Sequence, residues 1–434
     1  MITKLSTAFK PRRTALAALL GCLGSTAFAQ AQVDAPPPPP VASPPPITQP
    51  ATPPVSPFSI GLSQTLTHES NIFRLSTGEE SDWTSTTALN FALDEAFGRQ
   101  RLRGIGSLQA NRYRDHDDLD NTGHQLGLEL DWETIGELSG VLGVQSVRRQ
   151  YQFGLDSASP FQGRNIESTQ AANFRAQLGG MGLWSLHAGA DSLDRKYSDD
   201  TFDKLNRLSQ WSSEGGIGYK PSPDLSTMLV LRYTRISRPD TDLAPGDDVA
   251  RKEAELSANW QATGASKLDL RIGRADEKHS VAEDRSYWTG GIGWDWMPTG
   301  KLLLKTQLLR DAEGGSGNVV APDTTGAVPA RAGDLLRDAF IWTAQWAATS
   351  KINLTAGAEY SRRRYSDLIP DTTSHVVDRT TAIKLGVRYS PQRWLDLGCD
   401  IGHEHRETNT LDQTVTRPYD SLVAGCLATL WFRP

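Results

Sequence analysis

The sequence predicts an all-β protein: a transmembrane antiparallel up-and-down β-barrel of about 18 strands over residues 58–434. Apolar and polar residues alternate with period two in one segment after another. Tight turns alternate with long polar stretches, and aromatic residues recur beside the tight turns. Short turns on one side and long loops on the other are typical of barrels that cross an outer membrane.

The N-terminus predicts a secretory signal peptide over residues 1–29. Basic residues precede a short apolar stretch at 14–23, and Ala27-Phe28-Ala29 fits the small-x-small cleavage pattern. Arg12-Arg13 leaves twin-arginine export open, and Cys22 leaves lipidation open. Export is the expectation common to all three alternatives.

Residues 30–57 form a separate, Pro-rich segment. An unbroken proline run covers 36–40, and further prolines follow up to Pro57. Because proline lacks the backbone N–H and fixes its own φ, the segment can form neither a helix nor a central strand. We expect a disordered periplasmic linker, with a ligand for a periplasmic or cell-wall partner as the alternative.

Eight tight turns recur at intervals of about 42 residues from Phe58 onwards. The turns lie at 96–98, 135–136, 179–180, 221–223, 263–264, 298–300, 349–350 and 391–392. The long polar stretches between them lie at 76–82, 115–121, 156–165, 238–250, 312–334, 366–375 and 407–417. Two strands per interval give an even number with both chain ends on the periplasmic side, as a closed barrel requires. A propeller has a similar repeat length but needs four short strands per blade.

The strands show one apolar and one polar face. Leu126, Leu128 and Leu130, for example, interleave with Gly127 and Glu129. Each run covers about 10 to 14 residues, enough for a tilted strand to cross a bilayer. An aromatic girdle at one membrane interface is expected from Trp132, Tyr219, Trp260, Trp294, Trp296, Trp346, Tyr389 and Trp394.

The polar faces should line the lumen. The candidate lining residues are Glu129, Asp131, Arg232, Glu253, Glu255, Arg271, Asp295, Lys305, Glu359, Lys384, Arg388, Asp396 and Asp400. Both signs of charge are present, so the set favours neither anions nor cations. Residues 312–334 are numerous enough to fold inward and narrow the pore.

Two cysteines follow the signal peptide, and they are expected to lie on neighbouring strands. If the last loop centres near residue 412, Cys399 lies opposite residue 425 or 426, so Cys399 and Cys426 form a candidate outward-facing disulfide. Two free thiols are the alternative.

No cofactor and no metal site are expected. His403 and His405 share one strand face, and residues 115–120 are acidic, but neither set has the spacing of a known metal motif. The sequence contains no G-x-S-x-G, HExxH, P-loop or CxxC motif. We therefore expect no enzyme, with an outer-membrane hydrolase left open.

The charge balance gives no support for a nucleic-acid partner. The chain has 45 basic and 51 acidic residues, and removing residues 1–29 takes away four basic ones, which leaves 41 − 51 = −10.

Six stretches stand out as a set: 66–74 (LTHESNIFR), 111–114 (NRYR), 119–123 (LDNTG), 130–132 (LDW), 138–140 (LSG) and 164–169 (RNIEST). They resemble the EpsL-like family, β-barrel porin-like proteins of exopolysaccharide operons. The chain departs from the usual barrel ending, which is an aromatic residue, because Arg433 and Pro434 follow Phe432.

The resemblance implies an outer-membrane protein that exports a polysaccharide as a porin-like conduit or accessory. It brings no catalytic residues. The expected partners are the lipid bilayer, the barrel assembly machinery, a polysaccharide and other export components. A general small-solute porin and a plugged structural or adhesive barrel are the alternative functions.

Overall fold

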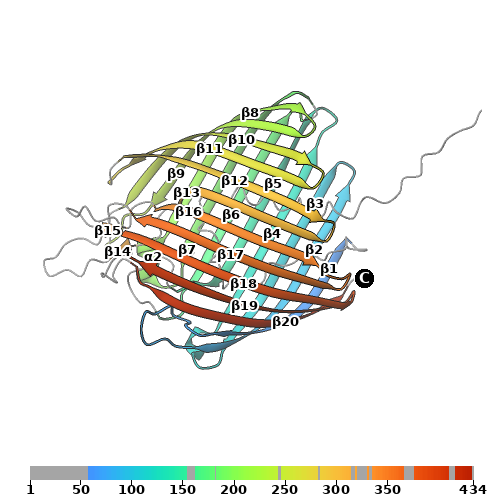
Figure 1. The fold of residues 1–434 in the computed structure, drawn as a ribbon. Helices are drawn as coiled ribbons and strands as arrows, with labels where there is room; N and C mark the ends of the chain where they lie inside the picture. The colour runs from blue at the N-terminus through green and yellow to red at the C-terminus, as the bar shows by residue number, and fades with distance from the viewer. Residues whose placement is uncertain are drawn as a thin grey trace, which may run out of the picture.

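A computed structural model describes residues 57–153, 162–180, 182–242, 246–281, 284–313, 318–319, 330–331, 335–365, 376–409 and 416–432. The predicted signal peptide, the Pro-rich linker apart from Pro57, and most of the 312–334 stretch lie outside these residues. Eighteen strands form one antiparallel sheet that closes on itself (Figure 1). The predicted fold class and strand number are confirmed.

The barrel strands follow one another in chain order around the cylinder, each paired with the next. They are β1 (Phe58–Glu69), β2 (Asp82–Phe97), β3 (Gln100–Tyr113), β4 (Asn121–Glu133), β5 (Leu138–Gln150), β6 (Ile166–Leu178), β7 (Trp184–Tyr197), β8 (Leu208–Ser222), β9 (Leu225–Arg238), β10 (Asp247–Thr263), β11 (Ser266–His279), β12 (Arg285–Thr299), β13 (Leu302–Glu313), β16 (Leu335–Ala347), β17 (Ile352–Tyr365), β18 (Val376–Gln392), β19 (Leu395–Thr408) and β20 (Tyr419–Phe432).

The first and last strands close the barrel. β1 pairs with β20 from Ile60 opposite Phe432 to Glu69 opposite Val423. The described chain therefore begins and ends at the same rim, the rim that carries the short turns (Figure 1). By the asymmetry of such barrels this rim is periplasmic, and the opposite rim with the long loops is external.

The two faces of the wall are inverted relative to a soluble protein. Leu256 and Leu231 on the outer face are 51% and 62% exposed, whereas Glu255 and Arg232 on the inner face are largely buried. Residues paired across neighbouring strands lie on the same face of the sheet, so the register assigns the residues of every strand to the inner or the outer face. An apolar exterior around a polar interior fits a barrel surrounded by lipid.

Outward aromatic side chains gather near the periplasmic rim. They include Phe97, Trp184, Trp260, Trp346, Trp394 and Phe432, all exposed. Indole and phenol rings favour the boundary between acyl chains and headgroups, so this ring of residues marks one membrane interface.

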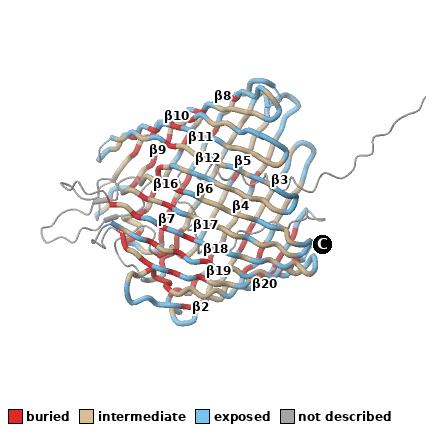
Figure 2. The backbone as a smooth tube through the Cα atoms, viewed as in Figure 1, coloured by how far each residue is buried: buried red, intermediate tan, exposed pale blue. Residues whose placement is uncertain are grey.

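Short helices and strands lie at the external rim. They are the 3-10 helix η2 (Asp117–Leu119), the helix α2 (Asp200–Asn206) and the two-residue pair β14 (Asn318–Val319) and β15 (Ala330–Arg331). Within the described residues, no helix combines the length and the apolar character needed to span a membrane. Buried residues concentrate toward this rim (Figure 2).

Candidate functional site

All thirteen predicted lumen residues lie on the inner face. The cross-strand register alternates them with the exposed apolar residues on every strand concerned, from Glu129 on β4 to Asp400 on β19. Many are paired with each other: Lys305 lies 3.3 Å from Asp295, and Lys384 lies 3.8 Å from Asp400. Ion pairs between neighbouring strands are therefore one component of the inner wall.

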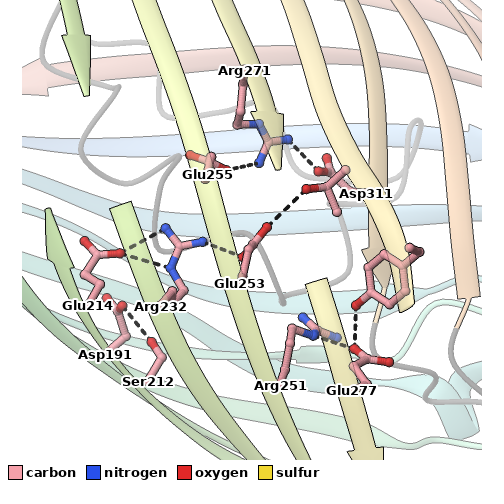
Figure 3. A network of polar contacts seen from close by, with 12 residues as sticks. Asp191, Ser212, Glu214, Arg232, Arg251, Glu253, Glu255, Arg271, Glu277 and Asp311 are labelled. Carbon is pink, nitrogen blue, oxygen red and sulfur yellow. Dashed lines mark hydrogen bonds and ion pairs between the residues drawn. The ribbon is translucent and has the colours of Figure 1, made fainter. Parts of the chain in front are cut away.

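Arginines that are each shared between two carboxylates form a ladder along the inner wall, and Figure 3 shows its part from Glu214 on β8 to Asp311 on β13. Arg232 lies 2.9 Å from Glu214 and 3.0 Å from Glu253. Arg271 lies 3.3 Å from Glu255 and 2.5 Å from Asp311. Each guanidinium is planar and can contact two acceptors at once, so it ties three strands together.

The ladder continues on β6 and β7. Arg175 lies 2.8 Å from Asp191 and 2.9 Å from Glu214. Three arginines of this ladder thus serve five carboxylates, which are Asp191, Glu214, Glu253, Glu255 and Asp311. This part of the wall has an excess of negative charge that the sequence, with its mixed signs, did not indicate.

The remaining candidates other than Arg388 have partners elsewhere on the wall. Arg103 pairs with both Glu129 and Asp131, and Glu359 pairs with Arg337. Asp396 accepts a hydrogen bond from the indole N–H of Trp431 at 2.7 Å. Arg388 lies on the inner face and has no ion-pair partner among the described residues.

The first external loop, loop 1 (residues 70–81), enters the mouth of the barrel. Arg74 is 1% exposed and lies 2.8 Å from Glu69 on β1 and 3.9 Å from Glu404 on β19. Its guanidinium also stands 5.7 Å from the ring centre of Tyr419 on β20. All three partners are inner-face residues, so the Arg74 side chain lies inside the wall.

Arg74 adopts φ 50°, in the left-handed region where residues other than glycine are uncommon. Such strain costs of order 1–3 kcal/mol and persists where surrounding contacts compensate for it. The buried ion pairs of Arg74 are such contacts, and they hold loop 1 in its inward position.

Loop 2 (114–120) and the described part of loop 3 that follows β5 (151–153) pack against loop 1. Ile72, Phe73, Leu119 and Phe153 form a buried cluster, and the rings of Phe73 and Phe153 are 5.0 Å apart. A second cluster joins Tyr151 of loop 3 to Tyr197 and to Phe202 of α2. Loops that are far apart in sequence therefore form one packed cap over part of the mouth.

His116 of loop 2 connects this cap to loop 1. Its Nε2 lies 2.8 Å from a Glu80 carboxylate oxygen, and its Nδ1 lies 2.9 Å from Asp82. Burial lowers the pKa of His116, but the hydrogen bonds to Glu80 and Asp82 outweigh it and raise the pKa above the ordinary value. The protonated imidazole donates to both carboxylates, so the contact is strongest when His116 is charged.

A cavity of about 200 Å³ lies beneath loop 1, between it and the inner wall. Thr65, Thr67, Thr86, Gln109, Asn111 and Tyr113 are among its lining residues. Hydroxyl and amide groups dominate this side of the cavity, and they can donate and accept hydrogen bonds.

Loop 1 is an inward loop that the sequence analysis did not single out. The stretch 312–334, which is long enough to fold inward and narrow the pore, lies mostly outside the described residues and stays a prediction. The sequence did not predict an inward position for loop 1 because this loop is short. The apolar pair Ile72-Phe73 between Asn71 and Arg74 was the available signal, since such a pair in a polar loop needs a buried environment.

Cys399 and Cys426 lie opposite each other on β19 and β20 and are joined in a disulfide, with Cα atoms 4.1 Å apart. Both point outward, away from the lumen. His403 and His405 also face outward, and His405 lies 2.7 Å from Asp420. No group of three metal-ligating side chains occurs among the described residues.

These features together decide what kind of protein this is. The chain is a transmembrane β-barrel. A closed antiparallel sheet of 18 strands with an apolar exterior, an aromatic ring and a charged interior is the form in which chains span bacterial outer membranes. The predicted location in the outer membrane follows from this form.

Comparison with known proteins adds a likeness of shape. No protein-family model matches the chain, and no curated protein sequence matches it either. The EpsL-like resemblance therefore gains no support from these searches. Among solved structures, Acinetobacter baumannii OccAB3 is 10% identical, with a TM-score of 0.48, and the match covers 87% of this chain and 100% of that one.

Two further structures show a similar likeness. Pseudomonas aeruginosa OccK5 (OpdH) is 12% identical with a TM-score of 0.46, covering 86% of this chain and 98% of its own. The siderophore receptor PirA from Acinetobacter baumannii is 9% identical with a TM-score of 0.44, covering 88% and 81%. At such identities and scores these likenesses assign neither a family nor a function.

Proposed function

We propose that the protein is an outer-membrane diffusion channel for small hydrophilic solutes. The observation that carries the proposal is the charged inner wall of a closed 18-stranded barrel, in which arginines pair with carboxylates of nearby strands from β6 to β13. Figure 3 shows the part of this wall from β8 to β13. Barrels of this strand number have room for an aqueous interior, and a charged wall stabilises water and ions there.

Loop 1 and the cap above it narrow the external mouth in this proposal. The wall charges then act on solutes that pass the remaining opening. The excess of carboxylates over arginines in the ladder predicts a preference for cations over anions, because fixed charges raise the local concentration of counter-ions.

Single-channel recording in planar lipid bilayers tests the proposal. The full chain, refolded and verified by the heat-dependent shift of its band on a gel, should give stable openings with cation selectivity. A folded barrel without conductance would refute the channel and favour a plugged structural or adhesive barrel.

Export of a polysaccharide is the second candidate, as the EpsL-like resemblance suggests. The cavity beneath loop 1 favours it, because Thr67, Gln109, Asn111 and Tyr113 offer the hydroxyl, amide and aromatic groups that bind sugars. Adding the secreted polysaccharide of the source bacterium to a conducting bilayer distinguishes the two. Block by the polymer supports export, and unchanged openings support a small-solute channel.

We propose no catalytic activity. Two Ser–His hydrogen bonds occur, between His124 and Ser146 and between Ser185 and His187. Among the described residues, no carboxylate forms a hydrogen bond with either imidazole, so neither pair has the third group that orients a catalytic histidine.

A further inference from the structure

A row of charged residues crosses the outer face of the barrel near the external rim. Arg310 on β13 lies opposite Asp338 on β16, Asp338 lies opposite Arg362 on β17, and Arg362 lies opposite Arg379 on β18. Arg364 stands two residues beyond Arg362 on the same strand face. Arg379 lies opposite Glu407 on β19, and Glu407 is 3.4 Å from His405 on its own strand. Four arginines therefore stand beside two carboxylates on the side of the barrel that faces lipid.

The pairing within the row leaves positive charge uncompensated. Asp338 lies 2.6 Å from Arg310 and 2.8 Å from Arg364. Among the described residues, Arg362 and Arg379 form no ion pair, and the buried Nε of Arg362 has no hydrogen-bond partner. Like charges directly opposite each other on one strand face are destabilising. An anion bound between or beside the guanidinium groups of Arg362 and Arg379 would reduce this repulsion.

The height of the row on the barrel indicates where that anion comes from. Asp338 is eight residues along β16 from Trp346 of the periplasmic aromatic ring, which is roughly 26 Å along the strand and about 20 Å along the membrane normal for a typical strand tilt. Arg379 is ten residues along β18 from Tyr389, and the same rise and tilt place it about 25 Å from Tyr389 along the membrane normal. The apolar band of such barrels is about 25 Å tall.

The residues just below the row fit a membrane boundary. Phe340 and Tyr360 lie opposite each other, two residues below Asp338 and Arg362, and both are exposed on the outer face. Aromatic rings occupy the headgroup level, and arginines placed directly above them reach the phosphates of lipid headgroups.

We propose that Arg310, Arg362, Arg364 and Arg379 bind a phosphate group carried by a lipid headgroup in the outer leaflet. Guanidinium groups match phosphate oxygens in two-point contacts, and a phosphate with about two negative charges would neutralise the Arg362–Arg379 pair. The site lies outside the lumen and does not depend on the proposed channel function.

Titration of diphosphorylated lipid A into the detergent-solubilised full chain, followed by native mass spectrometry, tests the proposal. Arg362→Gln and Arg379→Gln should each weaken binding about tenfold, the equivalent of one charge-assisted hydrogen bond of about 1.4 kcal/mol. Arg235→Gln is the matched control, because Arg235 is also outward and exposed but has its own partner Asp248 at 3.0 Å. The control should change binding less than twofold.

Dephosphorylated lipid A serves as the second arm. It should bind at least tenfold more weakly than the diphosphorylated form to the natural chain, and equally to Arg362→Gln. Equal binding of both lipids to the natural chain would overturn the proposal, since the contact would then be apolar. Displacement of the lipid by millimolar inorganic phosphate would overturn the lipid assignment in favour of a free-anion site.

Thermal unfolding without lipid guards against misfolded variants. Replacing one of two opposed arginines removes repulsion, so Arg379→Gln should unfold at the same or a higher temperature than the natural chain in lipid-free detergent. Added diphosphorylated lipid A should raise the unfolding temperature of the natural chain more than that of the variant at the same lipid concentration. A variant that unfolds earlier without lipid would show that the arginines stabilise the barrel itself, against the proposal.

Discussion

Removing the charge of Arg74 should release loop 1 from the barrel mouth. The substitution Arg74→Gln keeps a long polar side chain but leaves Glu69 and Glu404 without their cation. Loop 1 would then lose the ion pairs that hold Arg74 at φ 50°, while the apolar contacts of Phe73 remain.

The size of the effect follows from the burial of the group. Removing one partner of a buried ion pair costs about 3–5 kcal/mol, because the other charge stays buried and unpaired. Glu69 is 16% exposed and can gain water, so about 3 kcal/mol is the expected loss. At 1.4 kcal/mol per tenfold change, the ratio of inward to released loop falls by a factor on the order of 100.

Single-channel recording and limited proteolysis read out the release. Arg74→Gln should increase conductance or open-state noise and expose loop 1 to cleavage, and Arg74→Lys should restore part of the natural behaviour. Arg99→Gln is the control, because Arg99 lies at a periplasmic turn in an exposed pair with Glu133 that is worth at most about 1 kcal/mol. If Arg74→Gln conducts and resists protease like the natural chain, the inward loop is not held by Arg74.

The same loop should respond to pH through His116. Its raised pKa means that the contact with Glu80 and Asp82 is fully present below about pH 6.5, the ordinary histidine value, and is lost as the pH rises through the raised pKa. The current noise of the open channel in single-channel recordings should therefore increase with pH over that interval in the natural chain. His116→Gln should abolish this dependence, and an unchanged pH profile in that variant would contradict the assignment.

Three further predictions address the wall. Arg271→Gln leaves Glu255 and Asp311 without their shared cation. The reversal potential in a salt gradient should therefore shift toward greater cation selectivity. A shift toward anion selectivity would contradict the assignment of these charges to the wall of the conducting pore. Leu256→Arg on the outer face should destabilise the bilayer-inserted barrel by about 2–4 kcal/mol in denaturant titration, and Ser257→Arg on the inner face should destabilise it less. The reverse order would contradict the assignment of the outer face to lipid and the inner face to water. Reducing the Cys399–Cys426 disulfide, which spans 27 residues, should lower the free energy of unfolding by about 3–4 kcal/mol and leave conductance unchanged, since both sulfurs face outward.

The sequence predicted the wall well because period-two alternation is a local property. A strand that separates lipid from water must alternate, and the turns fix the register, so inner-face residues such as Glu255 and Lys305 could be assigned from spacing alone. The same spacing placed Cys399 beside Cys426.

The cap over the mouth could not be predicted in this way. Arg74 and Glu404 are 330 positions apart, and they meet because the barrel closes between β1 and β20. The sharing of each arginine between two carboxylates likewise depends on side-chain reach across three strands. Such contacts arise from closure and from loop packing, which leave no periodic signal in the sequence.

The inner and outer faces of one strand offer the most direct test of a water-filled lumen. Gln307 and Leu308 are adjacent on β13, and both are exposed, but Gln307 faces inward and Leu308 faces outward. Gln307→Cys and Leu308→Cys, reconstituted in proteoliposomes, can be treated with a charged, membrane-impermeant thiol reagent while the natural disulfide stays closed. Rapid labelling of Gln307→Cys with protection of Leu308→Cys is expected, and labelling of Gln307→Cys should also reduce conductance. Equal labelling of the two variants, or protection of Gln307→Cys alone, would contradict a hydrated lumen enclosed by an apolar exterior.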